Sequence, residues 1–535
     1  MKSAMRKVWI LAVAGLVGCG SPGDADRAGN NGSGGHDTPA PDNNAEPDNN
    51  GGPDSDDGYN IDEQSVNNST NGNGYAPVEP APANQGENYE ALTENDFVAT
   101  ADQATSTFSI DVDNASYTLM RRDLQSGALP HPDGVRVEEY VNFFDYDYVE
   151  PSGDSPFSIN LEVAPSAFGQ NLHMLRVGLK GRAITREEMR PANLVFLVDV
   201  SGSMSEEMPL VKYALTTLTN SLRPTDSIAI VTYAGDTGTL LEPTTVSEAS
   251  DILAAIAGMQ SGGSTYGEGG IVAAYEVAEA ARIDGGINRV VLVTDGDFNV
   301  GLSGQPLRDL VEAKRQLQIG LTVAGIGSGN FNDADLEAFA RTSNGNYFYI
   351  DGEEEADRIF GTEVTSTLEV IAADVKIQVA FDPAAVVRYR LVGYENRLLA
   401  NEDFEDDTKD AGEIGPGHTV TALYEIELAD ETAASSGFVA EVSLRHKAQF
   451  GVESTKQVQN IKRSQVKATL ADASPDLQFA MAVTEFAEIL RGSMHTDGSG
   501  LDTVETMATA NAGADAKRLE FLELLDLARP LLSAP

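Results

Sequence analysis

The sequence predicts an α/β protein with a doubly wound, mostly parallel sheet at its centre. A small mixed N-terminal domain and a C-terminal β-sandwich-like unit with closing helices are predicted to flank it. Apolar strands alternate with amphipathic helices between about residues 191 and 362, and strands alone follow from about residue 363. Near-continuous apolar strands separated by helices indicate a mostly parallel sheet covered on both faces.

The central section contains five apolar runs, of which NLVFLVDV and RVVLVTDG are the clearest. A short run, GTLLE, follows SIAIVTYA across a tight turn, so we expect it to form an antiparallel edge strand. Helical periodicity fills the intervals. The predicted strands are 193–200, 227–234, 238–242, 289–296, 320–327 and 346–351, and the predicted helices are about 207–222, 247–259, 267–283, 306–317 and 333–342.

Each flank has a pattern of its own. Residues 97–190 contain the alternating runs PFSINLEVAP and LHMLRVGLKG, which indicate strands in a small mixed α+β domain. Residues 363–535 begin with four alternating runs and end with apolar side chains at helical spacing, at about 475–491 and 514–529. We therefore expect a second, β-rich domain there, closed by helices.

Length and charge limit the functions that the chain can have. A chain of 535 residues is too long for one compact core, and about three folded units are expected. The formal net charge of -47 argues against nucleic acid as a partner, because Lys and Arg are needed to neutralise phosphates. Excess carboxylate suits an extracytoplasmic protein that attracts divalent cations.

The N-terminus has the pattern of an export signal. A basic stretch precedes an apolar run from Val8 to Gly18, which is too short to span a bilayer, and the single cysteine, Cys19, follows. The sequence LVGC resembles the lipobox of bacterial lipoproteins, which implies cleavage before an acylated cysteine. We therefore expect a signal peptide at 1–18 and a lipid anchor at Cys19 in the cell envelope. Gly20, and not Asp, follows the cysteine, which resembles the pattern for sorting to the outer rather than the inner membrane. The alternative is an ordinary signal peptide that contains a cysteine.

Residues 19–95 are rich in Gly, Asn, Asp, Pro and Ser and have few apolar side chains. Such a composition cannot offset the entropy cost of ordering, so we expect a lipidated cysteine followed by a disordered acidic tether. With Cys19 modified, no thiol is left for a disulfide or a cysteine metal site.

Oxygen-bearing side chains follow two predicted strands at the edge where open α/β sheets bind ligands. Asp199, Ser201 and Ser203 leave the first strand as Asp-x-Ser-x-Ser, and this spacing lets alternate side chains face one point. Asp295 leaves the strand RVVLVTDG, and the loop GGSTYG places Thr265 before a helix. The sequence therefore predicts that five side chains converge.

Two carboxylates and three hydroxyls form a small, hard site of the kind that Mg2+ (or Mn2+) prefers. No thiolate or imidazole belongs to the set, which disfavours zinc. Some of these groups would act through water, and one coordination position would stay open for an acidic side chain of another molecule. The alternative is a set of polar strand-end turns that cap helices, which would require three loops to supply the right atoms by chance.

The central section resembles the von Willebrand factor type A domain, which has a Rossmann-like fold and a metal-ion-dependent adhesion site. DVSGS at 199–203, the threonine of GGSTYG and the aspartate of TDGD match the complete motif. The resemblance implies that the two serines and Thr265 bind the metal directly or nearly so, that Asp199 and Asp295 often act through water, and that a partner's Asp or Glu completes the shell. The flanks, with FSIDVDNASYTLMRRDL and EEYVNFFDYDY, resemble bacterial lipoproteins with a family-specific N-terminal segment and a C-terminal domain of unknown function.

We therefore expect a surface or periplasm-facing lipoprotein, not an enzyme, that binds a protein partner through the metal. An envelope scaffold with a structural metal site is one alternative, and a metal-dependent hydrolase or phosphotransferase is another. All six histidines lie outside residues 191–362, and no Ser-His-Asp or Cys-His set is evident, which disfavours catalysis. Substitution of Asp199 would separate the three functions. Loss of binding with an intact fold would support adhesion, loss of turnover would support an enzyme, and loss of stability alone would support the scaffold.

Overall fold

The computed structural model describes most of the chain from residue 87 onward. The predicted signal peptide (1–18), Cys19 and most of the predicted tether lie outside the described residues, as does Thr265. In the described part, no helix is both long enough and apolar enough to cross a bilayer. The described residues are 87–263, 267–296, 305–327, 331–343, 345–430, 437–448, 453–496 and 500–533.

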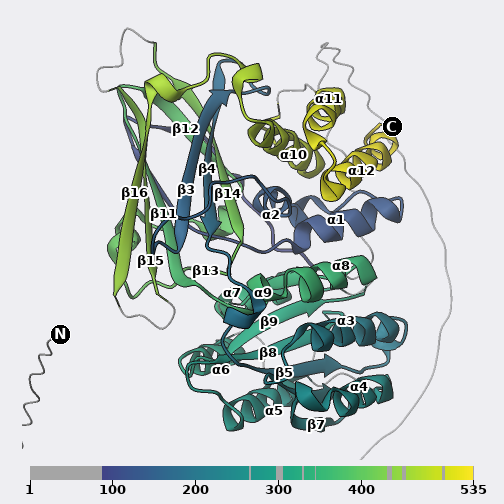
Figure 1. The fold of residues 1–535 in the computed structure, drawn as a ribbon. Coiled ribbons are helices and arrows are strands. Elements are labelled where there is room, and N and C mark those ends of the chain that lie inside the picture. Colours follow the sequence, from purple (N-terminus) through teal and green to yellow (C-terminus); the bar gives the residue numbers. More distant parts are fainter. Residues whose placement is uncertain are drawn as a thin grey trace, which may run out of the picture. The chain divides into compact units, whose positions relative to one another are not determined.

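A six-stranded sheet forms the centre of the central domain (Figure 1). Its strands are β5 (Ala192–Asp199), β6 (Ser227–Tyr233), β7 (Thr237–Thr245), β8 (Ile287–Thr294), β9 (Gly320–Gly325) and β10 (Tyr347–Tyr349). Their order is β10-β9-β8-β5-β6-β7, and all neighbours are parallel except β7, which pairs antiparallel with β6 at the edge. The predicted doubly wound, mostly parallel fold is confirmed.

Helices cover both faces of this sheet because alternate residues of its strands enter two different cores. Leu194 and Phe196 of β5 pack against α3 and α4, whereas Val195 and Leu197 pack against α5, α6 and α7. The helices of the central domain are α3 (Met208–Ser221), α4 (Ala249–Gly258), α5 (Gly267–Ala280), α6 (Gln305–Arg315), α7 (Asp333–Thr342), α8 (Glu353–Asp357) and α9 (Val364–Leu368).

The chain order places a topological switch point at β5. The chain leaves β5 for β6 on one side and later returns to β8 on the other side. Val198 of β5 pairs with Val293 of β8, so the carboxyl ends of these two strands lie together. Ligands bind at such a point in open α/β sheets, and Asp199 and Asp295 stand at the two strand ends.

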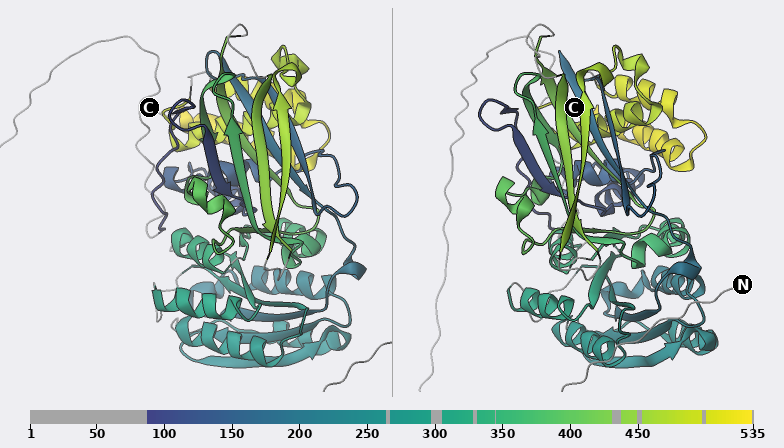
Figure 2. Two further views of the ribbon diagram at one scale, coloured as in Figure 1. Left: turned by 90° about the vertical axis from the view of Figure 1, so that its left-hand side faces the viewer. Right: turned by 60° about the vertical axis from the view of Figure 1, so that its left-hand side comes forward.

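Two further sheets form a β-sandwich (Figure 2). The first has the order β1-β12-β14-β4-β3, and the second has the order β13-β11-β15-β16, with β2 also beside β11. Their strands are β1 (Val98–Ala99), β2 (Thr105–Ser109), β3 (Phe157–Pro165), β4 (Leu172–Gly181), β11 (Ala372–Phe381), β12 (Val386–Val392), β13 (Gly412–Ile414), β14 (Thr419–Leu428), β15 (Phe438–Lys447) and β16 (Ser454–Lys462).

Both sheets combine strands from before and after the central domain. β4 pairs with β14 from Leu172↔Glu427 to Lys180↔Thr419, and β2 pairs with β11. The expectation of two separate flanking domains, at 97–190 and 363–535, therefore needs correction: the two segments share one sandwich core. Alternation in the sequence shows which face of a strand is buried, but it does not show which strand is its partner.

Helices from the two flanks also pack together. Aromatic rings from both segments meet in one cluster, where Phe144 lies 5.0 Å from Phe479 and 5.7 Å from Phe521 between ring centroids. Leu119 of α1 also packs in the core between the central sheet and helices α5, α6 and α7. These helices are α1 (Ala115–Gln125), α2 (Val137–Asn142), α10 (Pro475–Arg491), α11 (Gly500–Ala512) and α12 (Ala516–Leu532).

Candidate metal centre

The first loop of the candidate site is organised by Asp199, the last residue of β5. Its Oδ1 accepts a hydrogen bond of 2.8 Å from the backbone N–H of Ser201. The hydroxyl oxygens of Ser201 and Ser203 lie 2.9 Å apart. Asp199 and Ser201 are buried, so the local turn holds three of the predicted ligands together at the end of the strand.

The second loop adjoins the first through Thr294, the last residue of β8. Its hydroxyl donates a hydrogen bond of 3.3 Å to Asp199 Oδ2 and accepts one of 3.2 Å from the N–H of Gly296. Asp295 lies between these two residues and is buried. Four of the five predicted ligands, namely Asp199, Ser201, Ser203 and Asp295, therefore stand on two adjacent strand-end loops.

The third loop is bonded to the first through the backbone. Gly262 N–H donates to the carbonyl oxygen of Val200 at 2.7 Å, and Gly202 N–H donates to the carbonyl oxygen of Gly263 at 3.1 Å. Gly263 has a φ of +97°, which favours glycine. Thr265 itself lies outside the described residues. Its loop nevertheless reaches the Asp-x-Ser-x-Ser turn two residues before it.

The electrostatics of the site favour a cation. Burial raises the pKa of Asp199 to about 6, hydrogen bonding from Ser201 opposes that rise, and the nearby Asp295 carboxylate adds to it. The hydrogen-bond partners of Asp199 in the described residues, namely the N–H of Ser201 and the hydroxyls of Thr294 and Tyr233, are neutral. A dication would remove the cost of holding two carboxylates together in a buried place.

The set of donor atoms fits a hard metal ion. Carboxylate and hydroxyl oxygens suit Mg2+ or Mn2+, and neither imidazole nor thiolate belongs to the set. Within the described ranges, no group of three or more His, Cys, Asp or Glu side chains is placed to hold a metal ion. The candidate site is of a different kind, with two carboxylates and several hydroxyls.

Four neighbours of the site were not predicted from the sequence. Tyr233, at the end of β6, is fully buried and its hydroxyl faces Asp199, while Thr294 bonds directly to Asp199. Gly327 has a φ of +105°, and a Cβ there would lie 3.2 Å from Asp295 Cβ and 3.3 Å from Glu207 Cγ. Burial raises the pKa of Glu207, with Glu206 and Asp295 contributing. Tyr233 and Thr294 are the last residues of their strands, and this position was the one signal in the sequence that could have placed them beside the site.

Three family models match this chain, one at the central domain and one on each side of it. The model described as von Willebrand factor type A domain matches residues 193–362, and the von Willebrand factor model matches residues 83–176. The model described as Uncharacterized protein YfbK, C-terminal, matches residues 366–531.

Similar proteins include a bacterial relative that matches most of the chain. Uncharacterized protein YfbK of Escherichia coli (strain K12) is 37% identical over 468 residues, which is 82% of this chain and 80% of that protein. Inter-alpha-trypsin inhibitor heavy chain H2 of Mus musculus is 30% identical over 187 residues, 33% of this chain and 19% of that protein. A solved von Willebrand factor type A structure from Catenulispora acidiphila covers 71% of this chain and 91% of its own, with 15% identity and a TM-score of 0.44. The identity of 37% over most of both proteins shows that the chain belongs to the YfbK family, and the family model shows a von Willebrand factor type A domain at its centre.

Proposed function

We propose that this protein binds a protein partner through Mg2+ or Mn2+ held by Asp199, Ser201, Ser203, Thr265 and Asp295. An Asp or Glu of the partner supplies the remaining ligand. The convergence of Asp199, the two serine hydroxyls and the Asp295 loop at the switch point supports this most directly. The family of the central domain suggests a role in protein interaction or adhesion.

Calorimetric titration of the full chain with Mg2+ and Mn2+ tests the metal site. We expect measurable binding that Asp199→Ala abolishes, because that variant removes a buried carboxylate from the set. Asp251→Ala is the matched control, since it makes the same change of charge at an exposed position on α4. Absence of binding heat with both metals in the native chain would contradict the proposal.

The partner requires a second experiment. We expect the native protein to retain a partner from envelope extracts in Mg2+ and to release it in chelator, whereas Asp199→Ala retains none. If the variant keeps the partner and loses only thermal stability, the scaffold function with a structural metal is supported instead. If extracts reveal a hydrolytic or phosphotransfer activity that Asp199→Ala removes, the enzymatic alternative is supported.

We also propose that the protein is a lipoprotein anchored at Cys19 in the cell envelope, with the outer membrane favoured and the folded part extracytoplasmic. The basic, apolar and LVGC regions in order support this. Metabolic labelling with a fatty-acid analogue should mark the native chain and not Cys19→Ser. Fractionation of the two membranes then tests the predicted sorting, and an unlabelled native chain would contradict the anchor.

A further inference from the structure

Residues 87–95 belong to the predicted tether, but they lie against the folded domains. Residues 87–90, here called the strap, contact both α1 and the start of α7. The ring of Tyr89 packs against the core of the central sheet and stacks on His131 at 5.2 Å between ring centroids. Farther along, Asn95 donates to the carbonyl oxygen of Gly393 at 2.8 Å. The expectation of a disordered tether as far as residue 95 is therefore wrong for its last residues.

The strap is bonded through its backbone to the loop at the start of α7. Asn88 forms a parallel bridge with Asn332, and its side-chain amide donates to Asn332 Oδ1 at 3.1 Å. The N–H of Asn88 donates to the carbonyl oxygen of Phe331 at 3.0 Å. Its carbonyl oxygen accepts from the N–H of Ala334 at 3.2 Å. Three hydrogen bonds thus hold this loop to the strap.

The same loop packs against the metal centre. Gly296 follows Asp295 and has a φ of +88°, and an added Cβ there would lie 2.6 Å from the backbone nitrogen of Asn332. So close an approach leaves no room for a side chain between the two loops. A shift of Asn332 would therefore displace the backbone beside Asp295.

A chain of hydrogen bonds forms a second connection between the strap and the metal centre. The guanidinium of Arg122 in α1 donates to Glu87 at 3.0 Å and to the hydroxyl of Tyr349 at 3.2 Å. Tyr349, the last residue of β10, donates in turn to the carbonyl oxygen of Gly327. A Cβ at Gly327 would lie 3.2 Å from Asp295 Cβ. Both connections therefore end at the loop of Asp295.

The groups of this second connection are shielded from water. The side chain of Glu87 is 3% exposed and that of Arg122 is 13% exposed, while Tyr349 is buried. Hydrogen bonds between buried groups are stronger than those in water, whereas exposed ion pairs contribute little. Without Glu87, Arg122 would keep the carboxylate of Asp123, at 2.7 Å, but would no longer be held from the side of the strap.

We infer that the strap positions the loop of Asp295, so that docking of the strap and binding of the metal favour one another. The inference rests on the proposed metal site and adds a regulation of it. A strap released from Arg122 and Asn332 leaves the loop of Asp295 less firmly placed, and the affinity for metal falls. By thermodynamic linkage, the metal stabilises the docked strap by the same factor. Glu87 and Tyr349 are positioning residues, since neither belongs to the predicted ligand set.

Calorimetric titration of the full chain with Mn2+ tests the effect of the strap on the metal. Glu87→Ala should weaken Mn2+ binding at least about fivefold, the lower end of typical couplings between two sites. Glu162→Ala is the matched control and should bind as the native chain does. Equal affinities in Glu87→Ala and the native chain would overturn the inference. A loss of the same size in Glu162→Ala would overturn it too, because it would show a general effect of instability.

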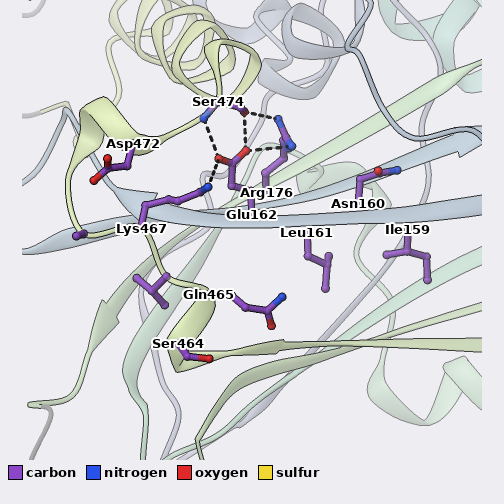
Figure 3. Close-up of a pocket in the computed structure, with 12 residues that line it drawn as sticks. Ile159, Asn160, Leu161, Glu162, Arg176, Ser464, Gln465, Lys467, Asp472 and Ser474 are labelled. Atoms are coloured by element: carbon purple, nitrogen blue, oxygen red, sulfur yellow. Dashed lines mark hydrogen bonds and ion pairs between the residues drawn. The ribbon is translucent and has the colours of Figure 1, made fainter.

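Glu162 is a suitable control because its surroundings resemble those of Glu87 at a different place in the fold. It is buried and pairs with Arg176 at 3.1 Å (Figure 3). The two residues lie beside an open groove of about 830 Å³. All residues that line this groove belong to β3, to β4 or to residues 464–474, and thus to the flanking segments.

A second variant leaves the strap intact and breaks the connection farther along. Tyr349→Phe keeps the ring and removes only the hydroxyl between Arg122 and Gly327, so it should fold and bind Mn2+ more weakly. Tyr424→Phe removes a buried hydroxyl in the sandwich, where it bonds to Ser106 at 3.0 Å, and should bind as the native chain does. Unchanged Mn2+ affinity in Tyr349→Phe would contradict the inference.

Hydrogen exchange of the full chain measures the reverse effect, that of the metal on the strap. The amide of Asn88 should exchange more slowly in Mg2+ than in chelator, whereas amides of β16 should not respond and Asp199→Ala should show no difference. If the native chain binds Mg2+ but exchange at residues 87–90 does not change, this inference is wrong and the proposed metal site stands. If the native chain binds neither Mg2+ nor Mn2+, the proposed function fails and this inference fails with it.

Discussion

Arg121 of α1 donates hydrogen bonds of 2.6 and 2.7 Å to the two carboxylate oxygens of Asp351, the second residue after β10. The same guanidinium lies 3.0 Å from the carboxylate of Glu355 in α8. The segment before the central domain is thus bonded to the domain at the carboxyl end of a strand. This edge of the sheet also carries the candidate metal centre.

Arg121→Ala should destabilise the folded protein strongly, because it leaves the buried carboxylate of Glu355 and the largely buried carboxylate of Asp351 without this partner. Breaking a buried pair from one side costs about 3–5 kcal/mol. Urea denaturation should show a loss of this size. Arg282→Ala is the control, since its partner Asp284 is 90% exposed, and it should cost at most about 1 kcal/mol. Equal losses would contradict a buried role for Arg121.

Thr294→Val should weaken metal binding while it keeps the shape of the side chain. The hydroxyl of Thr294 holds Asp199 Oδ2, and loss of such an outer contact typically reduces metal affinity by about 10- to 100-fold. Calorimetric titration with Mn2+ measures the change. Thr239→Val, on the edge strand β7, is the control and should bind as the native chain does. Unchanged affinity in Thr294→Val would show that Asp199 needs no support from this side.

Gly327→Ala should disturb the metal centre through crowding. The added methyl group would lie 3.2 Å from Asp295 Cβ, at a residue whose φ of +105° favours glycine. Gly285→Ala provides the control, because its φ is +69° and no atom lies within 4 Å of the added carbon. Both variants should lose about 1 kcal/mol of stability from backbone strain. Only Gly327→Ala should also lose metal affinity.

Glu138→Gln should reduce the loss of stability at alkaline pH. Burial raises the pKa of Glu138 to about 8, and the nearby carboxylates of Glu395 and Asp111 contribute. A carboxyl group with a raised pKa binds more protons when folded than when unfolded, so its contribution to stability falls as pH rises toward and through 8. Between pH 6.5 and 8.5, the melting temperature should fall less in Glu138→Gln than in the native chain. Parallel curves would contradict an ionisation of Glu138 in this range.

A fragment of residues 363–535 should not fold alone. β14 would lose its partner β4, and β11 would lose β2, so two long strand edges would be exposed. Circular dichroism and size-exclusion chromatography should show an unfolded or aggregated fragment, whereas a fragment of residues 191–362 should be folded. A cooperative melting transition in the 363–535 fragment would show that the shared strands are dispensable.

The sequence predicted the elements well where periodicity is strong. The helix expected at 475–491 is α10, which begins after the N-cap Ser474 and ends before Gly492. The run LHMLRVGLKG is β4, Leu172–Gly181. α11 was not predicted, because its sequence GLDTVETMATANA has few large apolar residues and the helix relies on packing against α10 and α12.

Strand pairing and contacts between distant residues could not be predicted in the same way. Strands of the sandwich show alternation of apolar and polar residues, but nothing in the run LHMLRVGLKG identifies HTVTALYEIEL as its partner strand. The order Asp-x-Ser-x-Ser predicted a local turn, and the structure adds Thr294 and Tyr233, which reach Asp199 only through the neighbouring strands. The position of Thr265 stays a prediction.

The position of β4 between β3 and β14 also bears on how the chain matures. A ribosome completes the β3–β4 hairpin first, yet a lone two-stranded ribbon is at best marginally stable in water. The central domain follows, and all strands of its sheet come from one continuous stretch. During synthesis, β4 therefore cannot pair with β14 until the last third of the chain has been made, so the sandwich is completed only after the central domain.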